Sequence, residues 1–384
     1  MRPRHPRRRG AVAAVAASLL ALSAGQALSA PPAAAAPHAA APTSAVSAAQ
    51  DQAARAIARS LSDADWRTRV QKAALASDEV AVTALAGQAG GTLKSTLVAA
   101  DHRIATAKGL DTGVGSLLRL RLGDRAMRGA LAAGLAPWVA AAATDDDATT
   151  VVAYDSGGRV HTLDPRHAPA RPVYVVDIDG SKALAAGLGV LHEELNRYGL
   201  ASAAPAPQRE ATAPPQARAA TAGFWTTRIT AVELSDDEEP WAKGDAEIYT
   251  LVTGFGQDGK VRVDPVDMPY LDNDGTVYRP GQILVNWSYY KYDLADAVMM
   301  EEDGSTNYRD LAKAIATALL TITDQGTYIP LVNAVLDAMP NDWWTDDPDY
   351  VDSWYTLARS DSGTRYGARG NGWMTVEPYF VQEF

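Results

Sequence analysis

The hydrophobic pattern of this chain changes its period near residue 149, and this change restricts the fold more than any other feature. Apolar residues recur at helical spacing from Asp51 to Leu75, and Ala/Leu-rich stretches continue to Ala143. Later segments are rich in β-branched and aromatic residues and are bounded by turn residues. We therefore expect an α+β fold. It would have a mostly helical N-terminal domain with a β-hairpin over 51–200 and an antiparallel β-sandwich with a helical insert over 223–384.

The individual elements can be placed from turn and capping signals. In the first domain, Asp155-Ser156-Gly157-Gly158 predicts a hairpin between strands at 149–154 and 159–163. A strand at 172–178 and a helix at 182–198 should follow. In the second domain we expect seven strands, with helices at 307–323 and 330–339 inserted before the last two. The strands are predicted at 224–234, 245–254, 260–264, 281–287, 294–300, 351–358 and 373–380.

Two Ala/Pro-rich segments flank the first domain. Residues 203–222 contain four prolines and no hydrophobic period, which predicts a semi-rigid linker. At the start of the chain, a cluster of arginines, an apolar run of about 12 residues and then small residues predict a signal peptide and an Ala/Pro-rich leader over 1–36. We expect a secreted, extracellular protein without a transmembrane segment, because no later stretch is long and apolar enough to span a bilayer.

Charge and cysteine content exclude several kinds of site. The chain has no cysteine, which rules out disulfides and thiolate metal sites. From Gly223 onward there are 28 acidic and 11 basic residues, a net charge of −17. Such a surface argues against a nucleic-acid partner, because phosphate binding needs basic faces. It permits cation binding or a merely solvated acidic surface.

The acidic residues of the second domain gather in three loops. Because sequential antiparallel strands alternate in direction, the loops at 235–245, 265–276 and 301–304 should emerge at the same end of the sandwich. Calcium accepts six to eight oxygen ligands with loose geometry and suits such a cluster. The alternative is a solvated acidic rim. The candidate calcium ligands are Asp236, Asp237, Asp245, Asp272, Asp274, Glu301 and Asp303.

Catalytic patterns are few. No histidine follows His192, so a Ser-His-Asp triad or a His-ligated zinc site within the second domain is excluded. His192 itself begins an incomplete zinc motif, in which Asn196 replaces the second histidine. The segment Asp177-Ile178-Asp179-Gly180 is interpreted as a capped turn before a helix, although it could also hold a cation or position a carboxylate. A carboxylate pair could serve as acid and base, but no pair stands out.

Several stretches carry a family resemblance. They are Leu234–Trp241 with Lys243–Tyr249, Asn307–Ala312, Asp349–Leu357 and, more weakly, Ile57–Leu61. They resemble the exported bacterial family catalogued as domain of unknown function 3103, a resemblance that implies no known activity. The first acidic loop is also similar to the calcium loop of C2 domains, with Asp236, Asp237 and Asp245 in the ligand positions. The Asp-Pro-Tyr signature of C2 domains is absent.

These observations leave three hypotheses for function. The first is a secreted calcium-binding β-sandwich that acts as an adhesion or interaction module, with a cell-surface, protein or carbohydrate partner. The second is a secreted hydrolase with a carboxylate-based site between the domains. The third is an interaction module that binds no metal.

Overall fold

The computed structural model describes residues 44–87, 91–142, 150–202, 223–235, 241, 243, 246–302, 304–339 and 350–382. The predicted signal peptide and linker lie outside this range, as do Asp236, Asp237, Asp245 and Asp303. Residues 43–384 form one compact unit. Among the described residues, no helix has the length and apolar character needed to cross a membrane.

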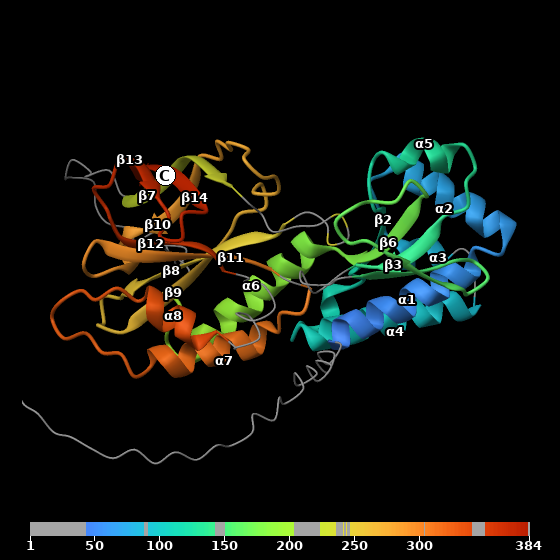
Figure 1. The fold of residues 1–384 in the computed structure, drawn as a ribbon. Helices are drawn as coiled ribbons and strands as arrows, with labels where there is room; N and C mark the ends of the chain where they lie inside the picture. Colours follow the sequence, from blue (N-terminus) through green and yellow to red (C-terminus); the bar gives the residue numbers. More distant parts are fainter. Residues whose placement is uncertain are drawn as a thin grey trace, which may run out of the picture. The chain divides into compact units, whose positions relative to one another are not determined.

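The N-terminal half is built on a six-stranded mixed sheet in the order β1-β2-β6-β3-β4-β5. Only β3 and β6 run parallel among these neighbours. Helices α1 and α4 lie side by side against the sheet (Figure 1). The elements of this half are α1 (Ala45–Ser60), α2 (Ala64–Ala76), β1 (Glu79–Val80), α3 (Val82–Ala86), α4 (Gly91–Ala107), η1 (Thr112–Val114), β2 (Leu118–Leu122), α5 (Met127–Ala132), β3 (Trp138–Ala141), β4 (Val151–Tyr154), β5 (Val160–Leu163), β6 (Val173–Ile178) and α6 (Gly180–Arg197).

Three strands of this sheet, including the two-residue β1, lie where the sequence predicted helix. The predicted hairpin is confirmed, with Val151 opposite Leu163 and Tyr154 opposite Val160. Strands β2 and β3, however, fall inside the Ala/Leu-rich stretch that was expected to be helical up to Ala143. The expectation was wrong for β2 because Leu118–Leu122 alternates leucine and arginine, which is the period of a strand. It was wrong for β3 because a four-residue, alanine-rich strand is too short to show any period.

The C-terminal half is a β-sandwich of two four-stranded antiparallel sheets, β10-β7-β14-β13 and β12-β11-β8-β9. Together with the helical elements of the N-terminal half, this confirms the α+β class. The short edge strand β13 was not predicted. The elements of this half are β7 (Gly223–Leu234), β8 (Ile248–Phe255), β9 (Val261–Asp267), β10 (Gln282–Asn286), η2 (Trp287–Tyr289), β11 (Leu294–Glu301), α7 (Tyr308–Leu319), α8 (Val332–Ala338), β12 (Tyr350–Ala358), β13 (Gly363–Tyr366) and β14 (Gly372–Gln382).

The second sheet of the sandwich is covered on both faces. All eight residues of β8 are buried. Ile248 and Val252 face the other sheet, whereas Leu251 and Phe255 join a core formed with α6, α7 and α8. Figure 1 shows these helices against the sheet. Because α6 belongs to the N-terminal half, the two halves share this core. Their division into two domains at 203–222 stays a prediction.

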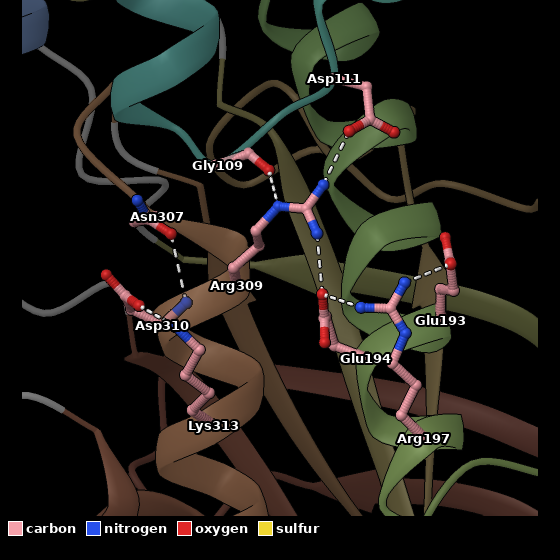
Figure 2. A network of polar contacts seen from close by, with 9 residues as sticks. All are labelled: Gly109, Asp111, Glu193, Glu194, Arg197, Asn307, Arg309, Asp310 and Lys313. Atoms are coloured by element: carbon pink, nitrogen blue, oxygen red, sulfur yellow. Dashed lines mark hydrogen bonds and ion pairs between the residues drawn. The ribbon is translucent and has the colours of Figure 1, made fainter.

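A network of polar contacts joins the halves at the start of α7 (Figure 2). Arg309 donates to the Gly109 carbonyl at 2.8 Å and forms ion pairs of 2.7 Å with Asp111 and Glu194. The Asn307 side chain caps α7 by accepting from the Asp310 N–H at 3.1 Å, and it donates to the Ala107 carbonyl at 2.7 Å. These contacts fix α7 to both α6 and the end of α4.

Candidate active-site pocket

Helix α6 meets the C-terminal half at two glycines, Gly180 and Gly187. They lie two turns apart and therefore on the same face of the helix. A Cβ atom at Gly187 would overlap the buried ring of Tyr308, and one at Gly180 would overlap the carboxylate of Glu247. The missing side chains thus allow Tyr308 and Glu247 to reach the helix backbone.

Two buried lysine–glutamate pairs lie beside Glu247. The fully buried Lys108 pairs with Glu302 and donates to the Gly304 carbonyl at 3.0 Å. The Lys243 Nζ lies 3.9 Å from the Glu301 Oε2, and each of these two side chains is 5% exposed. Glu301 is paired with Ile248 in the sheet, and the Glu302 N–H donates to the Glu247 carbonyl at 2.9 Å. The end of β11 therefore holds two glutamates against the segment that carries Glu247.

A cavity of about 520 Å³ opens next to Glu247 and is lined by residues of both halves. The N-terminal half contributes β1, β2, the end of β6 and the start of α6, and the C-terminal half contributes the segment before β8. The lining includes the carboxylates of Glu79, Asp177, Asp179 and Glu247 and the cations of Arg121 and Lys243. The volume of this cavity lies within the range of small-molecule sites.

Ion pairs across β2 and β6 hold two of the pocket's carboxylates. The Arg121 Nε lies 2.7 Å from the Asp177 Oδ2, and Arg119 pairs with Asp179. Asp179 also caps α6 by accepting from the Lys182 N–H at 3.1 Å. The predicted capped turn before this helix is therefore confirmed, and the same turn forms part of the pocket wall.

Burial raises the pKa of Glu247 well above the usual value for glutamate, and the nearby charges of Glu302, Asp177 and Glu301 raise it further. Burial also raises the pKa of Glu79, with a smaller contribution from Asp177 and Asp179. The pocket thus combines two carboxyl groups whose pKa is raised with two that form ion pairs with arginine. Environments that separate acids in this way are common at catalytic sites.

Three of the seven candidate calcium ligands are described. Asp272 lines the pocket and accepts hydrogen bonds from the Tyr278 hydroxyl at 2.7 Å and from the Asn273 side chain at 2.8 Å. Glu301 is buried, and its Oε1 has no hydrogen-bond partner among the described residues. Asp274 does not line the pocket. Within the part of the chain that the structure describes, no three carboxylates or histidines are arranged to hold a metal ion.

The sequence did not single out the main residues of this pocket. Glu79 lies in β1, Arg121 lies in β2 and Glu247 lies in the segment before β8, so they are far apart in the sequence and no local motif contains them. One signal was available for Glu247, because it directly precedes the buried strand β8 and a charge is unusual there. That signal does not reveal its neighbours.

The comparisons with known proteins agree with the resemblance noted in the sequence. A family model described as a protein of unknown function (DUF3103) matches residues 50–384. No curated protein and no solved structure matches the chain. Because the family match spans both halves and most of the chain, this protein belongs to the DUF3103 family.

Proposed function

We propose that this protein is a secreted hydrolase that cleaves a polar substrate in the pocket between its halves, with Glu247 as the proton donor. The observation that carries the proposal is the Glu247 carboxyl group, which packs against Gly180 at the pocket wall and has a raised pKa. A general acid must hold its proton near neutral pH, and enzymes achieve this for glutamate by burial and by nearby negative charge.

Asp177 is the partner that supports acid–base chemistry. It lines the same pocket, and its ion pair with Arg121 fixes the orientation of its carboxylate. In the proposed reaction Asp177 takes a proton from water while the water oxygen bonds to the substrate carbon. Glu247 gives its proton to the leaving group as the old bond breaks. Return of the proton from Asp177 to Glu247 through solvent restores both groups.

The test is a screen of the full chain on glycoside, ester and peptide substrates. Glu247→Gln keeps the size of the side chain but removes its proton, and it should lower kcat by about 10²–10⁴-fold, the usual contribution of a general acid. Glu193→Gln is the matched control, because Glu193 lies on the solvent side of α6 with its side chain 66% exposed. Equal activity of the Glu247→Gln variant and the wild-type protein would refute the assignment.

The proposed location outside the cytoplasm rests on the leader sequence over 1–36. Its basic, apolar and small-residue segments follow one another as in signal peptides. The measurement is expression in a bacterial host with and without these residues. A protein that stays in the cytoplasm with its leader intact would contradict the proposal.

Calcium binding is a second candidate, supported by the buried Glu301 Oε1 without a hydrogen-bond partner among the described residues. A cation would satisfy this oxygen, and the neighbouring acidic loops could supply further ligands. If calcium binds, millimolar calcium should raise the melting temperature of the full chain, and Glu301→Gln should remove that increase. Absence of both a heat signal and a melting shift in calcium titrations would exclude it.

A further inference from the structure

Among the described residues that line the pocket, one is aromatic, Trp241. The Trp241 ring packs against Gly123, where a Cβ atom would lie only 2.6 Å from the ring carbon Cζ3. Its Nε1 donates to the Asp164 carbonyl at 3.1 Å, and its own carbonyl accepts from Arg121 at 3.2 Å. The N-terminal sheet thus holds an indole from the C-terminal half at the edge of the pocket.

The charges of the pocket restrict its ligand. The described residues of the lining have seven carboxylates and four cationic side chains, which makes this part of the lining net negative. The cations are already engaged with carboxylates: Arg121 with Asp177 at 2.7 Å, Arg128 and Arg125 with Asp78 at 3.1 and 3.5 Å, and Lys243 with Glu301 at 3.9 Å. An anionic ligand would meet repulsion and would have to displace existing ion pairs. The charges of the pocket therefore leave neutral and cationic molecules as the candidate ligands.

The combination of a fixed aromatic ring with many hydrogen-bonding groups favours a neutral, polyhydroxylated ligand. A sugar ring presents C–H groups on its faces, which pack on an aromatic surface, and hydroxyls around its rim, which bond to carboxylates and arginine. A basic peptide would use the negative charge and could place a cation over the indole, so it is the competing ligand class that the binding experiment has to separate from a carbohydrate.

We propose that the pocket recognises a neutral carbohydrate and that Trp241 is the surface on which a sugar ring stacks. The inference rests on the proposed hydrolase function and specifies its substrate as a glycoside. In the reaction the bond from the anomeric carbon to the bridging oxygen breaks. The water oxygen bonds to that carbon, and Glu247 donates the proton that the bridging oxygen receives. Gly123 is a positioning residue, because it leaves the space that the indole occupies.

Binding can be measured without turnover. The full chain carrying Glu247→Gln is titrated by calorimetry with neutral hexasaccharides made of glucose, xylose or N-acetylglucosamine units. We expect one of these series to bind. Adding Trp241→Ala should weaken that binding by about tenfold, whereas Trp241→Phe should restore most of it. Trp373→Ala is the matched control and should have no effect, because Trp373 lies outside the pocket on β14 and donates to Glu233 at 2.9 Å.

The outcomes separate this inference from the function on which it rests. Binding of oligolysine but of no hexasaccharide would overturn the carbohydrate assignment, and so would unchanged sugar binding after Trp241→Ala. If the wild-type protein cleaves an ester or peptide in a Glu247-dependent way, the hydrolase proposal stands and the inference fails. Trp241-dependent sugar binding without any cleavage by the wild-type protein would support the inference and refute the hydrolase.

Discussion

The contact between Gly187 and Tyr308 offers a direct test of how the halves are joined. The Tyr308 ring is fully buried against the backbone of α6, and a Cβ atom at Gly187 would overlap three of its carbons. The ring has little room to move, because the Tyr308 N–H donates to the Lys108 carbonyl at 3.1 Å and the residue begins α7. Gly187→Ala should therefore force the two helices apart.

Gly189 provides the matched control on the same helix. It is exposed, and a Cβ atom there would have nothing within 4 Å. Gly189→Ala should stabilise the protein by up to about 1 kcal/mol through helix propensity alone. Gly187→Ala gains the same propensity but loses about 1–3 kcal/mol to overpacking. The difference between the two variants should thus be about 1–3 kcal/mol, with Gly187→Ala the less stable.

Urea unfolding followed by circular dichroism measures this difference. The midpoints of the two variants should move in opposite directions or by clearly different amounts, with similar slopes. Tyr308→Leu in the Gly187→Ala background should recover part of the loss, because the smaller side chain leaves room for the added methyl group. Equal stability of the two alanine variants would refute the packing of Tyr308 on α6.

Three further predictions concern buried charges. The folded-state pKa of Glu247 lies above its unfolded value, so its proton stabilises the fold fully below the ordinary pKa of about 4.3, and this contribution is lost as pH rises through the raised value. Glu247→Gln should therefore make the free energy of urea unfolding less dependent on pH over that range. An unchanged pH dependence would contradict the prediction. Lys108→Met leaves Glu302 buried without its cation and should cost about 3–5 kcal/mol in urea unfolding, whereas a loss below about 1 kcal/mol would show that the pair is not buried. Asp352 accepts hydrogen bonds from four backbone N–H groups through its two oxygens. Asp352→Asn should therefore lower the stability by about 1–3 kcal/mol for each of the two donors that face the new amide nitrogen. A calorimetric melting point equal to that of the wild-type protein would rule this out.

Local signals in the sequence were sufficient for much of the fold. The hairpin followed from Asp155-Ser156-Gly157-Gly158, and the structure shows why: Asp155 accepts from the Gly157 N–H at 2.9 Å, and Gly158 has a positive φ of 81°. The continuous apolar character of β8 was also visible, and it reflects burial on both faces. What the pattern could not show is that α6, from the other half, covers one of those faces.

Less of the candidate site than of the fold could be predicted from the sequence. Acidic residues of the C-terminal half drew attention to its loops, yet the pocket also needs Asp177 and Arg121 from the other half. The interpretation of Asp177 as part of a capped turn is correct but incomplete. The same turn contains Gly180, whose missing side chain leaves the space that the Glu247 carboxylate occupies. The local periodicity of the sequence does not reveal residues that are brought together only by tertiary packing.

Burial raises the pKa of Glu247, and the negative charges around the pocket wall raise it further. Of the ionisable groups described there, two glutamates have a lysine beside them: Glu302 with Lys108 and Glu301 with Lys243. Glu247 is the third glutamate in this cluster, and Asp177 adds a further negative charge. Burying an extra negative charge costs more than protonating it, so the excess is relieved at Glu247. Apolar residues could fill this space without such a cost, and the arrangement is therefore consistent with the chemistry that we propose for the adjoining pocket.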